Sequence, residues 1–204
     1  SSIFGYPFTK KEKKEEDFWN GLPKQNDMIP AIVKRIGEIQ AEAFFKQENW
    51  KGLRILRPAN VFGPHDDFNQ KTGQVIPSLI SKLFSNSKKL TVWGDGSAKR
   101  DFVYSKDVAR AILIILKDNK LIADPLNFGS GRTISIKLLV EKILKLSKIN
   151  KKIIWKKNAP TGDKIRLLSM KKFKTKIKRF KTTDIDDALK QTINWYKKQK
   201  KLYD

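Results

Sequence analysis

The sequence of 204 residues contains no cysteine and a single histidine, His65. The absence of cysteine excludes disulfides, thiolate chemistry and zinc sites built from cysteine ligands. One histidine also excludes a metal site with several histidine ligands, so we expect no metal. No apolar run approaches the ~18–20 residues of a membrane span, and the apolar stretch 109–117 fits a buried helix instead. We therefore expect a globular protein without a membrane segment.

Arginine is scarce in a chain that is otherwise strongly basic. Only eight of the 44 lysines and arginines are arginine, while the formal net charge is +23 and the pI is near 10.1. Proteins that read nucleic-acid sequence favour arginine for bidentate and stacked contacts. The lysines are also spread along the chain, with a denser share after residue 150. We therefore keep nucleic-acid binding only as a third interpretation, and expect the charge to attract small anionic substrates.

Helix and strand signals alternate along the chain, which is typical of an α/β protein. Residues 8–27 are polar and charged and indicate a loop. The loops after the expected strands contain Asn60 and several glycines, and ligands in such sheets bind at the carboxyl ends of strands. Helices are expected over 30–47, 75–86, 105–119, 135–150 and 182–200, and short strands over 53–56, 89–93, 126–129 and 151–157.

Local signals refine the expected helix boundaries. Pro30 suits a first helical position, and Val33, Ile36 and Phe44 form an apolar stripe at helical spacing along the helix that follows. Ser105 and Ser135 are candidate N-caps of two later helices. In the final helix, aspartates stand in the first turn and lysines in the last, as the helix dipole favours.

Five motifs occur in a fixed order and spacing and together resemble one family. Singly each is weak, but in register they resemble the extended short-chain dehydrogenase/reductases, namely the NAD-dependent epimerase/dehydratases of nucleotide sugars, with GDP-L-fucose synthases and their relatives as the nearest branch. The motifs are "RPANVFGPHDDF" (57–68), "VIPSLI" (75–80), "VWGDGSAKRDFVYSKDVARA" (92–111), "LNFGSGRTISI" (126–136) and "PTGDKIRLL" (160–168).

The resemblance implies a partial Rossmann-type, doubly wound parallel sheet with an interleaved smaller α/β substrate-binding domain. On this basis residues 1–204 form an incomplete epimerase/dehydratase unit. Residues 1–64 would be the remainder of the Rossmann domain, and 65–204 mainly the substrate-binding region with a return strand near 126–129. The Gly-rich turn that holds the cofactor in this family has no counterpart in the sequence, which is therefore expected to match the C-terminal two-thirds of a longer enzyme.

The resemblance also assigns catalytic and cofactor roles. "SSIFGY" (1–6) is similar to the family's serine motif, which makes Ser2 the catalytic serine. "AIVKRIGE" (31–38) is similar to the helix of the Tyr-x-x-x-Lys motif, which makes Lys34 the lysine that binds the nicotinamide ribose and lowers the pKa of the tyrosine. A nearby cation does favour a phenolate. The cofactor would be NAD or NADP, and Pro58 is expected at its binding site.

The chain departs from the family at the positions that move protons. Four residues before Lys34 stands Pro30, so no phenol is available there for proton transfer. GDP-fucose synthases have a cysteine near the serine motif and a histidine before "VIP" for epimerisation, and here these positions hold Phe4 and Gln74. We therefore do not expect the two-step epimerisation of a GDP-fucose synthase.

Four residues are expected to bind substrate. Basic residues at the positions of Arg100 and Arg166 contact the nucleotide diphosphate in relatives, and arginine meets phosphate oxygens in pairs. Asn60 matches the asparagine of the "RPxN" motif beside the substrate, with a turn residue as the alternative. Trp93 could lie against the sugar or base, or belong to the core.

Two hypotheses follow from the resemblance. The first is a cytoplasmic, NAD(P)-dependent nucleotide-sugar epimerase/reductase or dehydratase of surface polysaccharide biosynthesis, with a nucleotide-diphosphate sugar as its partner and a homodimer as its assembly. The second is a non-catalytic remnant that still binds a nucleotide sugar. The missing tyrosine and Gly-rich turn leave the choice between enzyme and binding protein open.

Overall fold

The computed structural model describes residues 1–9, 11–159 and 163–200. Its longer helices are α1 (Met28–Gln47), α2 (Val75–Phe84), α3 (Ser105–Leu116), α4 (Ile136–Ser147), α5 (Lys171–Lys176) and α6 (Ile185–Gln199). Short 3-10 helices are η1 (Ile3–Gly5), η2 (Glu15–Trp19), η3 (Gln25–Asp27) and η4 (Asn119–Leu121). The strands are β1 (Leu56–Pro58), β2 (Asn60–Phe62), β3 (Lys89–Trp93), β4 (Lys99–Arg100), β5 (Phe102–Tyr104), β6 (Leu126–Phe128), β7 (Ile134–Ser135), β8 (Lys152–Lys156) and β9 (Ile165–Arg166).

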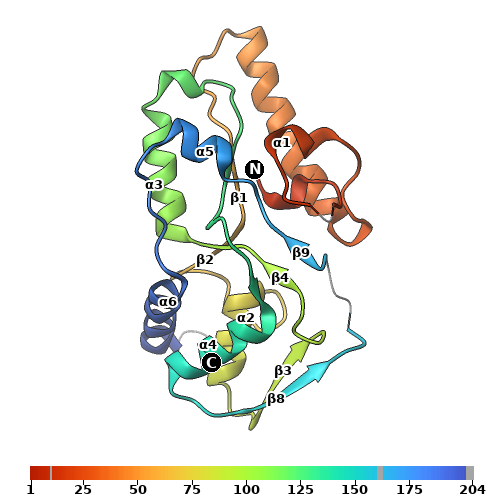
Figure 1. Cartoon of the computed structure of the whole chain (residues 1–204), viewed down its shortest axis with the longest axis vertical. Helices are drawn as coiled ribbons and strands as arrows, with labels where there is room; N and C mark the ends of the chain where they lie inside the picture. The colour runs from red at the N-terminus through yellow and green to blue at the C-terminus, as the bar shows by residue number, and fades with distance from the viewer. Residues whose placement is uncertain (10, 160–162, 201–204) are drawn as a thin grey trace.

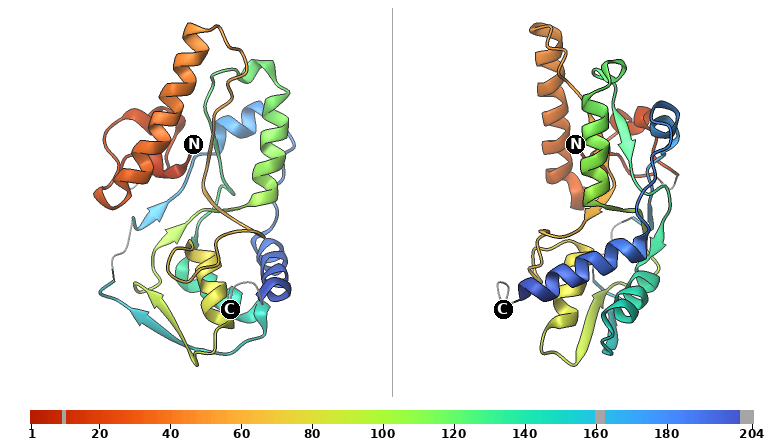
Figure 2. Two further views of the ribbon diagram at one scale, coloured as in Figure 1. Left: turned by 180° about the vertical axis from the view of Figure 1, so that it is seen from behind. Right: turned by 90° about the vertical axis from the view of Figure 1, so that its left-hand side faces the viewer.

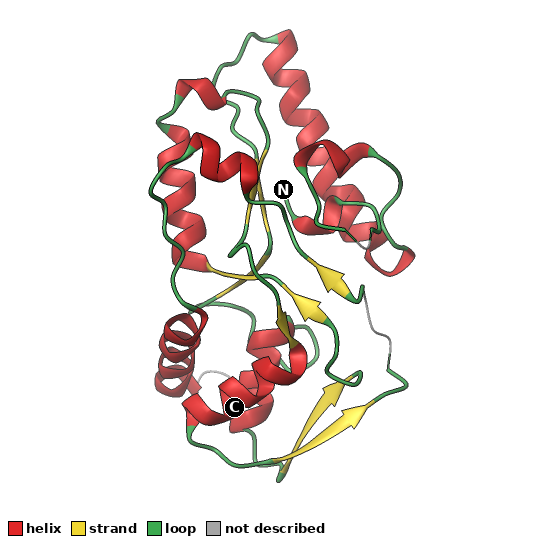
Figure 3. Cartoon of the chain, viewed as in Figure 1, coloured by secondary structure: helices red, strands yellow, loops and turns green. Residues whose placement is uncertain are grey.

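Most strand pairs are parallel and are connected through helices, which confirms the α/β class. β1 pairs with β6, β2 with β5 and β3 with β8, all in parallel. β4 lies between β7, to which it is antiparallel, and β9, to which it is parallel. Figure 1 shows α1 on one side of β1, with α3 and α5 on the other, while α2, α4 and α6 gather at the opposite end with β3 and β8. Figure 3 shows the same arrangement with helices and strands in different colours.

Two apolar clusters form the interior, one at each end of the long axis (Figures 1 and 2). The first, which we call the pocket half, packs side chains of α2, α4 and α6 against β3 and β5. The second, the lysine half, packs the N-terminal segment, β1, β6, α3 and α5 together. β4 and β9 lie in the middle of the molecule between them. These two short strands therefore sit where the two halves meet.

Charged side chains hold helix α1 to the interior. The apolar stripe that the sequence predicts along this helix faces solvent, with 59% of Val33 and 62% of Phe44 accessible. The buried residues of α1 are Ala31, Arg35 and Glu38. Side chains with fixed hydrogen-bond partners, rather than the apolar stripe, therefore attach this helix to the rest of the molecule.

Arg35 shows how that attachment works. Its Nε donates to the carbonyl of Gly5 at 2.8 Å, and its Nη2 donates to the carbonyls of Phe18 and Gly21 at 2.5 and 2.8 Å. Burying a guanidinium is tolerable when its donors are satisfied in this way. The segment 8–27, expected to be a plain loop, therefore contains η2 and η3 and buries Phe18 completely.

Three local predictions have mixed outcomes. Ser135 caps α4 as expected, because its Oγ accepts from the N–H of Leu138 at 3.1 Å. Ser105 is not an N-cap: it is the first residue of α3, and Tyr104 stands at the cap position. The strand expected at 53–56 is β1, which begins at Leu56, because its parallel partner β6 sets the paired residues.

Among the described residues, no helix is both long enough and apolar enough to cross a membrane.

Candidate functional site

The largest cavity in the pocket half lies between α2, β3 and β4. Its volume is about 570 Å³, within the range usual for small-molecule sites. The lining residues come from the loop before α2, one face of α2, and the strands: Gln70, Lys71, Gly73, Gln74, Val75, Ser78, Leu79, Lys82, Thr91, Val92, Trp93, Ala98, Arg100 and Ile136. We call this space the cationic pocket, for the reason that follows.

The charged side chains that line the cationic pocket are all positive. They are Lys71, Lys82 and Arg100, and no aspartate or glutamate is among the lining residues. Neither lysine forms an ion pair within the part of the chain that the structure describes. Burial lowers the pKa of Lys82, and the charge of Lys156 lowers it further. Such a pocket favours an anionic guest.

The start of α2 adds to the same preference. Its N-cap, Gln74, makes no side-chain capping bond, and the first turn contains no acidic residue. The backbone N–H groups of the first turn and the positive end of the helix dipole are therefore not neutralised by a carboxylate of α2 itself. An anionic group here would satisfy orphan donors as well as cationic side chains.

Trp93 and Arg100, both expected at the substrate, line this pocket. Trp93 lies on β3 and is 62% exposed, so its ring is available to a ligand and the alternative of a core tryptophan is excluded. Arg100 lies on β4, and its Nη1 donates to the carbonyl of Asp163 at 2.5 Å. Burial and the neighbouring Arg166 lower the pKa of Arg100 to about 10. It therefore stays charged near neutral pH.

Arg166 lies beside Arg100 but is held differently. The two residues are opposite each other in the parallel pair of β4 and β9. Arg166 does not line the cationic pocket. Its Nε contacts Asp163 at 3.2 Å and its Nη2 pairs with Asp27, while the guanidinium lies 5.0 Å from the ring centre of Phe4. The expected phosphate role of Arg166 stays a prediction, since two carboxylates occupy its donors.

Ser2 and Lys34 belong to elements that pack together in the lysine half. Ser2 precedes η1, and its Oγ accepts from the N–H of Phe4 at 3.3 Å. α1 packs against η1. Lys34 lies close enough to this segment to affect the amino group of Ser1: burial lowers the pKa of that group, Glu38 raises it, and Lys34 lowers it further. Lys34 itself is exposed.

Tyr6, in the N-terminal motif, and Tyr104, in β5, have hydroxyls that form hydrogen bonds within the protein. The hydroxyl of Tyr6 donates to Oδ1 of Asn127 at 2.5 Å and accepts from Arg57 at 3.2 Å. Burial raises the pKa of Tyr6 to about 12. The hydroxyl of Tyr104 contacts Gln191 at 3.1 Å, in the pocket half. Pro30, at the position of the family's tyrosine, is exposed and has no phenol. Neither Tyr6 nor Tyr104 therefore has a free hydroxyl to take its place.

Asn60 and Pro58 lie at the strands that leave the lysine half. Nδ2 of Asn60 donates to the carbonyl of Asp101 at 2.7 Å. Asn60 is the first residue of β2, which does not fit the alternative interpretation of a turn residue, and its amide joins β2 to the β4–β5 connection. Pro58 ends β1 and is partly exposed. Neither residue lines the cationic pocket, and their substrate and cofactor roles stay predictions.

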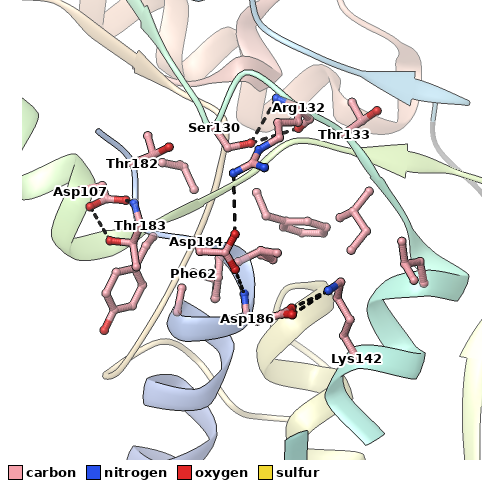
Figure 4. A pocket seen from close by; sticks show the side chains of 17 residues that line it. Phe62, Asp107, Ser130, Arg132, Thr133, Lys142, Thr182, Thr183, Asp184 and Asp186 are labelled. Atoms are coloured by element: carbon pink, nitrogen blue, oxygen red, sulfur yellow. Dashed lines mark hydrogen bonds and ion pairs between the residues drawn. The ribbon is translucent and has the colours of Figure 1, made fainter. Parts of the chain in front are cut away.

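A second cavity, shown in Figure 4, is lined by charged side chains of both signs. Its volume is about 280 Å³, and it lies between α4, the start of α6 and the loop after β6. Lys142 pairs with Asp186 at 2.7 Å, and Arg132 lies 3.9 Å from Asp184. None of the residues expected at the site lines this cavity. It therefore lacks the unpaired cations that distinguish the cationic pocket.

Sequence reasoning missed Lys71 and Lys82. In a chain with so many lysines, neither residue stands out by type. A signal for Lys82 exists, however, because Val75, Ser78, Leu79 and Lys82 follow the i, i+3, i+4, i+7 pattern of one helix face. Once Trp93 and Arg100 are placed opposite that face, Lys82 becomes a candidate.

Comparisons with known proteins identify the family and the fold of the chain. The model of the NAD dependent epimerase/dehydratase family matches residues 7–129. The chain is 29% identical over 94% of its length to the probable GDP-L-fucose synthase 1 of Oryza sativa subsp. japonica, and 28% identical over 98% to the dTDP-4-dehydro-6-deoxy-D-allose reductase of a Streptomyces species. It spans only 59% and 60% of those relatives.

The solved structures show the same fold. The chain superposes on a GDP-L-fucose synthetase from Naegleria fowleri, crystallised with NADP, with a TM-score of 0.90. That match covers 98% of this chain and 65% of the other, at 24% identity. A UDP-N-acetylglucosamine 4-epimerase from Methanobrevibacter ruminantium, in complex with UDP-N-acetylmuramic acid, matches with a TM-score of 0.78 at 26% identity. The likeness therefore extends over nearly the whole of this chain.

Proposed function

The chain belongs to the NAD dependent epimerase/dehydratase family. On this basis we propose that it acts as an NAD(P)-dependent nucleotide-sugar oxidoreductase or isomerase. The nucleoside diphosphate of the substrate would bind in the cationic pocket. The observation that carries the proposal is the lining of that pocket: Lys71, Lys82 and Arg100 without a carboxylate, next to the exposed ring of Trp93. A diphosphate with an aromatic base matches this combination in charge and shape.

The geometry suggests how the diphosphate would be held. Arg100 already has one donor fixed on the carbonyl of Asp163, so the position of its guanidinium is restricted before a ligand arrives. Lys82 projects from α2 on the pocket face, and the free N–H groups of the same helix lie at its start. Phosphate oxygens would therefore meet side-chain cations and backbone donors at once. Preorganisation of this kind strengthens binding because less freedom is lost.

Lys34, Ser2 and Pro58 are the residues of this chain that we assign to the NAD(P) site. The ammonium of Lys34 is exposed and has no carboxylate partner among the described residues, so it is free to contact ribose hydroxyls. This fit is partial, because the sequence contains no Gly-rich turn for the cofactor pyrophosphate. The cofactor, when bound, supplies or accepts a hydride. Ser2 would position the sugar beside Lys34.

The two-step epimerisation of a GDP-L-fucose synthase is not part of the proposal. The positions that would carry the acid and base hold Phe4 and Gln74, and neither side chain exchanges a proton near neutral pH. Gln74 lines the cationic pocket, where its amide can donate and accept hydrogen bonds to a ligand. Reduction or dehydration of the sugar fits these residues better than a reaction with two inversions.

We also propose a homodimer in the cytoplasm, where nucleotide sugars are made for surface polysaccharides. The exposed apolar stripe of α1, which includes Ile29, Val33, Ile36 and Phe44, supports an assembly through this helix. A second copy of the same stripe is self-complementary, as a twofold interface requires. Burying it would remove from water the apolar surface that this chain leaves uncovered.

A second candidate function is a nucleotide-sugar-binding protein without catalysis. The observation that favours it is Pro30, because the engaged hydroxyls of Tyr6 and Tyr104 provide no replacement for the missing phenol. In this case the cationic pocket would bind its ligand as in the enzyme, and only the proton transfer would be lost. Both candidates therefore share one binding site and differ in turnover.

The proposal is tested by calorimetric titration with GDP-mannose, UDP-glucose and dTDP-glucose. We expect one of them to bind, and Arg100→Met to weaken binding by about ten- to a hundredfold, the effect of losing a charge-assisted hydrogen bond. Arg132→Met, which removes a guanidinium from the second cavity, serves as the matched control and should bind normally. Equal affinities of the two variants would contradict the proposal. Tight, salt-sensitive binding of duplex DNA without a response to any nucleotide sugar would favour the nucleic-acid interpretation.

A further inference from the structure

Asp27 lies on the chain directly before α1 and reaches across to β9. Its carboxylate pairs with the guanidinium of Arg166, and its side chain is 22% exposed. As the N-cap of α1 it makes no side-chain capping bond, although aspartate is among the preferred capping residues. The carboxylate is therefore committed to Arg166, which lies in a different element far along the chain.

Asp163 holds the same guanidinium from the other side. Its Oδ2 lies 3.2 Å from Nε of Arg166, and its Oδ1 lies 2.9 Å from Nζ of Lys24. Burial raises the pKa of Asp163, but the hydrogen bond from Lys24 and the charge of Arg166 outweigh it and hold the pKa below its usual value. Asp163 therefore carries its charge near neutral pH.

The charges of this cluster differ from those of the neighbouring pocket. Arg100, which is paired with Arg166 across the two strands, faces a pocket whose charged lining residues are all cations. Arg166 faces a space of only about 10 Å³ that Asp27 and Asp163 also line. That volume has room for about one water molecule. A phosphate can therefore reach Arg166 through this space only if one of the groups that line it moves.

We propose that Asp27 is a specificity-determining residue that acts as a built-in competitor for the anionic ligand: its carboxylate occupies Arg166 in the free protein and is displaced when a diphosphate bridges Arg100 and Arg166. This inference rests on the proposed nucleotide site. Asp27 is the carboxylate that moves, because Asp163 is 7% exposed and is tied to Lys24 as well as Arg166, whereas Asp27 has Arg166 as its ion-pair partner among the described residues.

Displacement of Asp27 would connect the pocket to the element that carries Lys34. Asp27 adjoins Met28, the first residue of α1, and Lys34 follows within two turns. When a ligand takes over Arg166, the tie between β9 and the start of α1 is released. The first turn of α1 therefore changes its surroundings only when the anionic site is filled. A contact of this kind makes the lysine half responsive to a ligand bound in the pocket half.

The test uses inorganic pyrophosphate as a probe that does not depend on the base, with the intact protein. Asp27→Asn keeps the size of the side chain and removes its charge. We expect it to bind pyrophosphate about five- to tenfold more tightly than the unmodified protein at low salt, with the difference shrinking as salt is added. Asp95→Asn is the matched control: it removes a carboxylate from the turn after β3, where Asp95 accepts from Ser97 and pairs with no guanidinium among the described residues.

A second measurement needs no stable variant. Pyrophosphate added to the unmodified protein should shift the NMR signals of the backbone amides of Met28, Ile29 and Ala31, in the first turn of α1. Unchanged signals there, together with binding at the cationic pocket, would overturn the inference and leave the proposed function standing. The inference also fails if Asp27→Asn binds pyrophosphate no more tightly than Asp95→Asn. If the unmodified protein binds neither pyrophosphate nor a nucleotide sugar, the proposed function itself fails.

Discussion

The two halves of the molecule bury different kinds of side chain. Around β1 and β6 the lysine half encloses charged groups, among them Lys13, Arg35, Glu38 and Arg57. In the pocket half the buried polar side chains of α2, α4 and α6 are small hydroxyls, such as Ser78 and Thr192. The lysine half therefore uses its charges internally. The pocket half is held together by apolar packing. The cations that line its cavity have no carboxylate beside them in the lining and can bind an anionic ligand.

This difference separates binding from chemistry. The pocket half has a formed cavity with unpaired cations, which is what recognition of an anion requires. The lysine half contains Lys34 and Ser2 but has a proline where proton transfer would need a phenol, and its two tyrosine hydroxyls named above are engaged. The pocket half therefore fits the proposed binding role, whereas the lysine half lacks one group that the proposed chemistry requires.

Removing one partner of the buried pair in the lysine half should have the largest effect on stability. Arg57 is 2% exposed and donates to both oxygens of Glu38, at 2.8 and 2.7 Å. Glu38→Gln leaves the guanidinium without its counter-charge, so we expect the free energy of unfolding to fall by about 3–5 kcal/mol. Chemical denaturation followed by circular dichroism measures the change.

Glu42→Gln is the control for that prediction. Glu42 lies on the same helix and pairs with Lys46 at 2.7 Å, but the two side chains are 50% and 69% exposed. An exposed pair of this kind contributes about 0.5 kcal/mol or less. If Glu38→Gln cost no more than Glu42→Gln, the buried charges of the lysine half would not be what holds it together.

Restoring a phenol should have the next largest effect. Pro30→Tyr places a tyrosine one helical turn before Lys34, at an exposed position of α1. A positioned general acid contributes about a hundredfold or more to a rate, so we expect reduction of a nucleotide 4-keto-sugar to rise by at least that factor. Oxidation of NADPH by the intact protein reports the rate.

Pro30→Ala separates chemistry from backbone effects, because it removes the proline ring without adding a phenol. If both variants turned over at the same rate, the proton would come from another group, and the view that the lysine half has lost its chemistry would be wrong. If Pro30→Tyr alone gains activity, the unmodified protein is best described as a binding protein.

Asp101, which lies where the two halves meet, should give a smaller, pH-dependent effect. It is fully buried, and burial raises its pKa to about 6 in spite of hydrogen bonds from Ser130. The folded state therefore binds more protons than the unfolded state between about pH 4 and 6. The stability contributed by Asp101 is thus present below pH 4 and is lost as the pH rises through 6.

Asp101→Asn removes this titration. Relative to the variant, the unmodified protein should lose up to about 3 kcal/mol of unfolding free energy between pH 4 and pH 7, from a pKa difference of about two units. Denaturation at both pH values gives the change. Asp95→Asn, at an exposed turn, should show no such loss, and a constant difference for Asp101→Asn would contradict the assigned burial penalty.

The sequence predicts well where structure depends on local pattern. Ser135 caps α4 because capping involves a hydroxyl and an amide three residues away. Trp93 and Arg100 line one pocket because they lie close together in the same family motif, residues 92–111. The final helix also begins as expected, with Asp184 accepting from the N–H of Asp186. Features of this kind need no knowledge of distant partners.

The sequence predicts poorly where a side chain finds its partner far along the chain. The inward face of α1 depends on the bonds of Arg35 to carbonyls up to 30 residues away. The pairing of Asp27 with Arg166 spans 139 residues. No periodicity or motif contains these contacts, so the sequence reveals neither the attachment of α1 through Arg35 nor the carboxylates at Arg166.

Binding of a nucleoside diphosphate in the cationic pocket underlies both the proposed function and the role of Asp27. A crystal structure of the protein with the nucleotide sugar that binds in the titration would decide it. We expect electron density for the diphosphate between the start of α2, Lys82 and Arg100, with Trp93 against the ligand. Density in the second cavity, beside Arg132 and Lys142, or a cationic pocket left empty at saturating nucleotide, would show that the diphosphate does not bind there.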